Sequence, residues 1–78
     1  MTTLKFIEDF RDQFDLLDED VIIDLSTEFK QLEDWDSLVA LSIIAMADEE
    51  YGVRISGDDI RGATTVQDLL TLVEARRS

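Results

Sequence analysis

The sequence contains no cysteine, no histidine and no proline in its 78 residues. Without cysteine, the chain has no disulfide framework, no thiolate zinc site and no cysteine nucleophile, so nothing marks an oxidising compartment. Without histidine, a Ser-His-Asp triad and an HExxH zinc helix are both excluded. The length suits one small domain. We therefore do not expect a self-sufficient enzyme.

Basic residues are also scarce, with 7 against 19 acidic residues and a net charge of −12. Nucleic acids and anionic lipids are polyanions that favour Lys and Arg, so neither is an expected partner. The longest uncharged stretch runs from Ser37 to Ala47, far short of the roughly 20 residues that a membrane helix needs. No basic region followed by an apolar one marks a signal peptide. We expect a soluble, cytoplasmic monomer without membrane insertion.

Apolar residues make up 45% of the chain, which is enough for a core. Their spacing at positions 4, 7, 10, 14 and 17 predicts a helix over residues 4–17, with its phenylalanines in the core. Residues 18–36 have no clean period and form a long connection. Its apolar residues indicate a loop held onto the helices: Val21, Ile22, Ile23, Leu25, Phe29, Leu32 and Trp35.

Acidic side chains could suggest two further kinds of site, and both are rejected. A calcium loop beginning at Asp18 would need an oxygen ligand and a glycine where Ile22 and Ile23 stand, so no metal site is expected. Asp58 and Asp59 could form the carboxylate pair of a hydrolase. A capping role explains them, and so small a chain has little room for a pocket beside its core.

Three more helices are predicted after the connection. The first covers residues 37–51, is apolar nearly all round and ends before Gly52. A short helix runs from about residue 57 to Gly62, after the capping box of Ser56 and Asp59. The last starts at a second box, either Thr64 with Gln67 or Thr65 with Asp68, and ends near residues 76–77. The expected fold class is all-α: a small bundle of three longer helices and one short helix.

A serine stands at the start of the apolar helix, in the tripeptide Asp36-Ser37-Leu38. A helix N-terminus presents unpaired backbone N–H groups and the positive end of the helix dipole, which together stabilise a phosphate. The tripeptide alone also permits a simpler interpretation, in which Asp36 or Ser37 is only an N-cap.

The chain resembles the acyl and peptidyl carrier proteins, the phosphopantetheine-bearing modules of fatty acid, polyketide and nonribosomal peptide synthesis. Phe29 lies eight residues before the serine, as in those carriers, and Asp36-Ser37-Leu38 matches their DSL attachment motif. Residues 48–55 resemble the family's acidic helix end with its aromatic residue and glycine, and residues 64–69 resemble the start of its last helix. Many fatty acid carriers have the motif LGxDSL, but this chain has Glu33-Asp34-Trp35 before Asp36 and lacks that glycine. Its Leu32 stands one position further from the serine than the leucine of the motif does.

The resemblance implies a single carrier domain over residues 1–78 that carries acyl or aminoacyl thioesters in fatty acid, polyketide or related biosynthesis. It implies that a phosphopantetheinyl transferase esterifies Ser37 with 4′-phosphopantetheine from coenzyme A, that Asp36 is a polar shoulder of this site, and that synthase enzymes are partners. The cofactor would bring the sulfur and the partners the chemistry, so the chain is expected to be a carrier and not an enzyme. The alternative is an unmodified helical adaptor that binds a partner protein through residues 37–51.

The helix that follows the serine is the expected partner surface. Three- and four-residue spacing assigns Leu41, Ile44 and Ala47 to the core. The outward set is then Leu38, Val39, Ser42 and Ala45, and acids arrive only at Asp48 and Glu49. We expect an apolar contact near Ser37 and an acidic steering patch further along.

Overall fold

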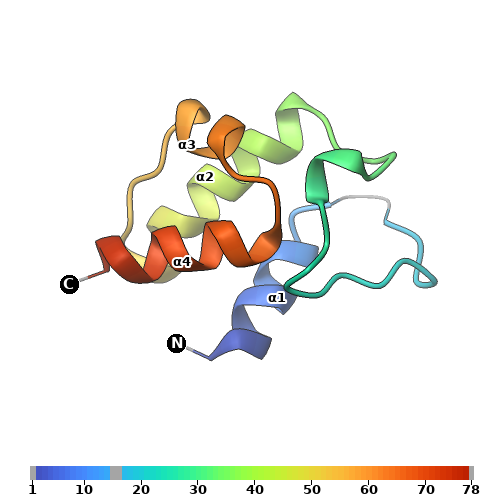
Figure 1. The fold of residues 1–78 in the computed structure, drawn as a ribbon, viewed down its shortest axis with the longest axis horizontal. Coiled ribbons are helices and arrows are strands. Elements are labelled where there is room, and N and C mark those ends of the chain that lie inside the picture. Colours follow the sequence, from blue (N-terminus) through green and yellow to red (C-terminus); the bar gives the residue numbers. More distant parts are fainter. Residues whose placement is uncertain (1, 15–16, 78) are drawn as a thin grey trace.

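The computed structural model describes residues 2–14 and 17–77, which form four α-helices and, within those ranges, no strand (Figure 1). The elements in chain order are α1 (Thr3–Arg11), a turn of 3-10 helix η1 (Phe29–Gln31), α2 (Ser37–Tyr51), α3 (Gly57–Gly62) and α4 (Val66–Arg76). The predicted all-α bundle, with three longer helices and one short one, is confirmed.

Helix α1 is shorter than predicted, and its first apolar position is not buried. It ends at Arg11, and the next residues turn, with the Gln13 N–H donating to the Phe10 carbonyl at 3.1 Å. Phe6 and Phe10 are buried, whereas Leu4 is 65% exposed. The phenylalanines therefore lie in the core as predicted, whereas Leu4 of the predicted spacing does not, because the large phenylalanine rings bury more area than Leu4 would. Residues 15 and 16 of the predicted helix lie outside the described ranges.

The long connection between α1 and α2 is held onto the helices, as predicted. The Arg11 side chain donates to the carbonyls of Val21 and Asp18, which turns the chain back at the end of α1. The carbonyls of Leu25 and Thr27 accept hydrogen bonds from the first N–H groups of α4. Ile23 and Phe29 are buried, and Val21, Leu25, Leu32 and Trp35 are partly buried against the core. Ile22 is the exception, since it is exposed.

Local hydrogen bonds set the ends of the other helices. Helix α2 has the predicted bounds, and Gly52 after it has φ +65°, a left-handed conformation that glycine adopts without strain. The Ser56–Asp59 capping box opens α3 as predicted. Of the two boxes considered for α4, the structure forms Thr65 with Asp68.

The helices pack around one hydrophobic cluster that includes residues of all four. Helix α2 contacts α1 and α3, and α1 also contacts α4. In Figure 1 the long connection lies to the right and ends where α2 begins, and the short α3 lies beside α2. The fold thus brings two segments to the first turns of α2: the end of the long connection and α3.

Candidate functional site

Ser37 is the first residue of α2, and its side chain is exposed. A tight turn precedes it, in which the Trp35 N–H donates to the Leu32 carbonyl at 3.1 Å. Asp36 then adopts an extended conformation with φ −153° and caps the helix. The turn and the cap together place the serine hydroxyl at the outer edge of the helix start.

Aromatic rings fix the turn that delivers Ser37. The Trp35 ring packs edge-on against Phe29, with 4.9 Å between centroids, and Phe29 packs in the same way against Phe10 of α1 at 5.6 Å. Phe14 contacts both Trp35 and Phe10. Edge-to-face aromatic pairs at these separations are favourable beyond the area they bury. The serine is therefore positioned by a row of rings that reaches the core, although its own side chain is exposed.

The start of α2 leaves backbone donors for an anion. The first intrahelical hydrogen bond runs from the Ala40 N–H to the Asp36 carbonyl at 3.1 Å, so the N–H groups of residues 37–39 precede it. Asp36 Oδ1 accepts the Val39 N–H at 2.9 Å. The N–H groups of Ser37 and Leu38 remain at the positive end of the helix dipole, which favours negative charge beside the serine hydroxyl.

Two hollows flank the serine, and they differ in charge. One, of about 490 Å³, lies between α2 and α3 and is mostly apolar, with Ala40, Leu41, Ile44 and Ile60 in its wall and Lys30 and Arg61 as its cations. The other, of about 300 Å³, lies on the opposite side of α2. The described residues of its lining include three carboxylates and no cation. They are Gln13, Glu33, Asp34, Trp35, Asp36, Leu38, Val39 and Ser42. Trp35 and Asp36 border both hollows, and Ser37 lines only the first.

The predicted outward face of α2 is only partly correct. Leu38 is 72% exposed, Ala45, Asp48 and Glu49 are exposed, and Ser42 is half-buried. Val39, in contrast, is only 7% exposed and belongs to the core, whereas Leu41, assigned to the core, is 61% exposed. Ile44 is half-buried, and Ala47 is buried as predicted.

The physical reason is that α2 is apolar on nearly every side. Val39, Ile43 and Met46 are spaced as a helical stripe just as Leu38, Leu41 and Ala45 are, so spacing cannot choose between the two sets. The neighbours of α2 bury the first set. The exposed apolar surface beside Ser37 therefore consists of Leu38 and Leu41, and Val39 is not part of it.

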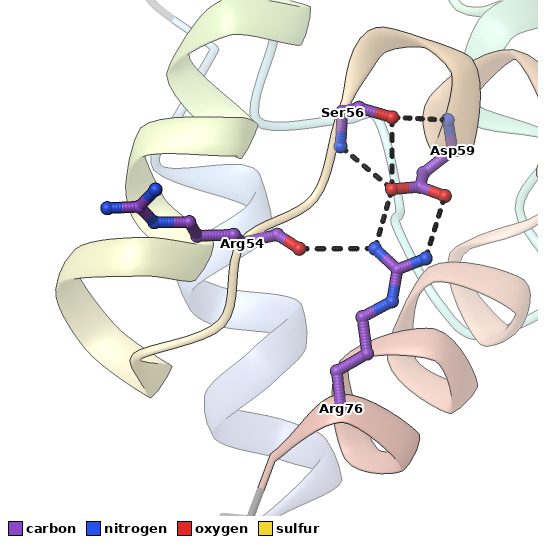
Figure 2. Close-up of polar contacts among 4 residues, drawn as sticks. All are labelled: Arg54, Ser56, Asp59 and Arg76. Atoms are coloured by element: carbon purple, nitrogen blue, oxygen red, sulfur yellow. Dashed lines mark hydrogen bonds and ion pairs between the residues drawn. The ribbon is translucent and has the colours of Figure 1, made fainter.

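Helix α3, one wall of the larger hollow, is tied to α4 by a contact that sequence analysis missed. Figure 2 shows the Arg76 guanidinium reaching Asp59, with Nη1 2.6 Å from Oδ2 and Nη2 3.0 Å from Oδ1. Nη1 also donates to the Arg54 carbonyl at 3.1 Å. Sequence analysis assigned Arg76 only to the helix C-terminus, and nothing in the sequence marks a partner 17 residues away.

This contact changes the titration of both residues. Hydrogen bonding from Arg76, together with the Ser56 N–H, lowers the pKa of Asp59 to about 2. The same carboxylate raises the pKa of Arg76. Asp59 is therefore ionised throughout the neutral range and completes both the α3 capping box and the ion pair.

A second polar cluster ties α1 to the end of α2. The Tyr51 hydroxyl donates to Asp9 Oδ2 at 2.6 Å, and Lys5 Nζ lies 2.6 Å from the same oxygen and 5.0 Å from the Tyr51 ring centroid. Burial and the Asp9 hydrogen bond raise the pKa of Tyr51. Desolvation alone would raise the pKa of Asp9, but the hydrogen bonds from Lys5 and Tyr51 outweigh it and lower that pKa.

The part of the chain that the structure describes contains no group of three or more acidic side chains placed to hold a metal ion. Within the same ranges, no helix is both long enough and apolar enough to cross a membrane.

Comparison with known proteins identifies the family. The family model described as "Phosphopantetheine attachment site" matches residues 4–73. The chain belongs to this family. A search of curated proteins finds no significant match. Among solved structures, the chain is similar to the solution NMR structure of a holo acyl carrier protein from Geobacter metallireducens, with 26% identity and a TM-score of 0.74; the match covers 97% of this chain and 86% of that one.

Family membership makes the chain a carrier protein whose cofactor is covalently attached phosphopantetheine. The carrier's site fits such a group. It combines an exposed hydroxyl, two backbone N–H groups that precede the first intrahelical bond, and an adjoining hollow of about 490 Å³ with an apolar wall. An attached arm supplies the thiol that carries an acyl group, a function that no residue of this chain can provide without cysteine.

Proposed function

We propose that Ser37 is the residue that bears phosphopantetheine, and that the chain carries acyl or aminoacyl groups as thioesters on this arm. The observation that carries the proposal is the position of Ser37, exposed as the first residue of α2 with backbone N–H donors beside it. A phosphodiester at that position is favoured by the helix dipole. Fatty acid or polyketide synthesis, or a related pathway, would use such a carrier.

The modification step is a phosphoryl transfer from coenzyme A. The Ser37 hydroxyl oxygen bonds to the phosphorus that bears pantetheine, and the bond from that phosphorus to the oxygen of the leaving adenosine 3′,5′-bisphosphate breaks. The serine proton passes to a base of the phosphopantetheinyl transferase. We assign Asp36 the role of a polar residue beside the modification site that caps α2, since its Oδ1 accepts the Val39 N–H. Coenzyme A is an intracellular metabolite, which supports a cytoplasmic location.

We propose that the transferase and the synthase enzymes contact the exposed face of α2. Its apolar part consists of Leu38, Leu41 and Ala45, with Ser42 half-buried at its border, and its acidic part consists of Asp48 and Glu49. Basic patches on partner enzymes would be attracted to the acidic part, which raises the association rate more than the affinity.

Intact-protein mass spectrometry tests the proposal. The protein is incubated with coenzyme A and a broad-specificity phosphopantetheinyl transferase, and we expect one added phosphopantetheine. Ser37→Ala should abolish the gain, whereas Ser42→Ala, on the same helix, should keep it. No gain in the wild type would favour the unmodified adaptor, and a gain in Ser37→Ala would place the arm on another residue.

A further inference from the structure

Cations are rare in this carrier, yet two of its 7 basic residues, Lys30 and Arg61, line the hollow that Ser37 also lines. They come from separate parts of the chain, since Lys30 belongs to η1 in the long connection and Arg61 to α3. Among the residues that the structure describes, those lining the hollow on the other side of α2 include three carboxylates and no cation. Asp36 borders both hollows, so the lining is net positive on the side of Lys30 and Arg61 and net negative on the other.

Lys30 is held at this position by specific contacts. Its Nζ donates to the Arg61 carbonyl at 2.9 Å and lies 6.0 Å from the Phe29 ring centroid. An ammonium has three donors, and the carbonyl takes one of them. The Lys30 ammonium is thus fixed against the last turn of α3 with donors left for a further oxygen.

Arg61 has a weaker attachment and can change partner. Its guanidinium pairs with Asp58, but both side chains are largely exposed, at 73% and 83%. Exposed ion pairs of this kind contribute little to stability, so another anion can replace the carboxylate at low cost. The Arg61 guanidinium also lies close to Gly57. The distance between Arg61 Nη1 and the position that a Cβ on Gly57 would take is 3.6 Å.

We propose that Lys30 and Arg61, which line the same hollow as Ser37, bind the phosphodiester of the attached arm. The inference rests on Ser37 as the attachment residue. The phosphate is bonded directly to the serine oxygen, and the carboxylates of Glu33 and Asp34, which line only the opposite hollow, repel it from that side. Without a cation nearby, a further negative charge on a chain of net charge −12 would be unfavourable.

Amide NMR spectra of the apo and holo forms test the proposal. Each holo sample is first checked by mass spectrometry, so a failure of modification at Ser37 is separated from a failure of this inference. In modified wild type, we expect the largest shifts, besides those next to Ser37, at Lys30, Gly57 and Arg61. Gln13 and Ser42, which line the opposite hollow, should shift little.

Variants then test the role of the two charges. Lys30→Gln/Arg61→Gln should remove the shifts at Gly57 and change the ³¹P resonance of the arm. The control Arg54→Gln/Arg77→Gln removes the same amount of positive charge but away from the hollow. It should leave the Gly57 shifts and the ³¹P resonance unchanged. Attachment of the arm should also lower the melting temperature of the first double variant more than that of the control, by about 1–5 °C at low salt.

Lys30 also hydrogen-bonds α3, so its loss alone could displace that helix. Arg61→Gln leaves this bond intact and should still reduce the shifts at Gly57 that follow attachment of the arm. Lys30→Arg keeps the charge and should retain those shifts. A confirmed holo protein whose arm shifts Gln13 and Ser42 instead would overturn the proposal. Equal responses of the two double variants would do the same.

Discussion

Asp59 and Arg76 join the start of α3 to the end of α4 through two hydrogen bonds between guanidinium and carboxylate (Figure 2). The same carboxylate accepts the Ser56 N–H at 2.8 Å, so one side chain both caps α3 and fixes it to α4. Because α3 forms a wall of the hollow beside Ser37, this pair helps to set the shape of the attachment site.

Replacing Arg76 should weaken the fold in a pH-dependent way. Asp59 has a lowered pKa of about 2. Its contribution to stability is thus present above its unfolded pKa of about 3.9 and is lost as the pH falls towards 2. Arg76→Gln should lower the melting temperature at neutral pH, and its difference from wild type should shrink between about pH 4 and pH 2. Arg77→Gln, with the same change in charge, is the control. Parallel pH profiles for wild type and Arg76→Gln would show that the pair does not stabilise the fold.

Neighbouring substitutions on α2 should separate its buried face from its exposed one. Val39→Asp places a carboxylate in the core, which should cost about 3 kcal/mol or more and cause cooperative loss of helix. Leu38→Asp changes an exposed residue and should alter stability by less than about 0.5 kcal/mol, yet slow modification by the transferase. Circular dichroism and modification rates measure the two effects. A folded Val39→Asp variant would contradict the burial of Val39.

Glu49 should act on partner association through its charge. Glu49→Lys should lower the association rate with the transferase by about 3- to 10-fold at low salt, where the Debye length is about 10 Å or more. The effect should disappear at high salt, and stopped-flow measurements at several ionic strengths would follow it. Glu74→Lys on α4 makes the same charge change on another helix. An equal effect of Glu74→Lys would show that total charge, and not an α2 patch, governs the encounter.

Added salt should stabilise the protein. The net charge of −12 is confined to a body of 35 × 24 × 20 Å. The Debye length of about 30 Å at 0.01 M salt spans this body, whereas that of about 3 Å at 1 M does not. We expect the melting temperature to rise by roughly 5 °C or more over this range. Millimolar magnesium should act in the same direction through general screening. A melting temperature independent of salt would show that repulsion between the acids is weak in the folded state.

The sequence alone determined the features that depend on neighbours within about four residues. The bounds of α2, the left-handed Gly52 and the Ser56–Asp59 box were all predicted, because a cap is a hydrogen bond between positions close in the chain. The placement of Ser37 at a helix start followed from the same local rules. The apolar residues of the long connection were also enough to predict that it is held onto the helices.

The tertiary structure decided what depends on distant partners. Spacing could not choose the buried face of α2, because two stripes of apolar residues fit and only packing against the other helices buries Val39 and exposes Leu41. Helix α1 ends at Arg11, whose side chain donates to carbonyls 7 and 10 residues further along the returning chain. The pair Asp59–Arg76 and the contact of Lys30 with α3 join positions 17 and 31 residues apart, and no local pattern carries such information. Burial and ion pairing are decided by which segments meet in space, and that is fixed only when the helices pack.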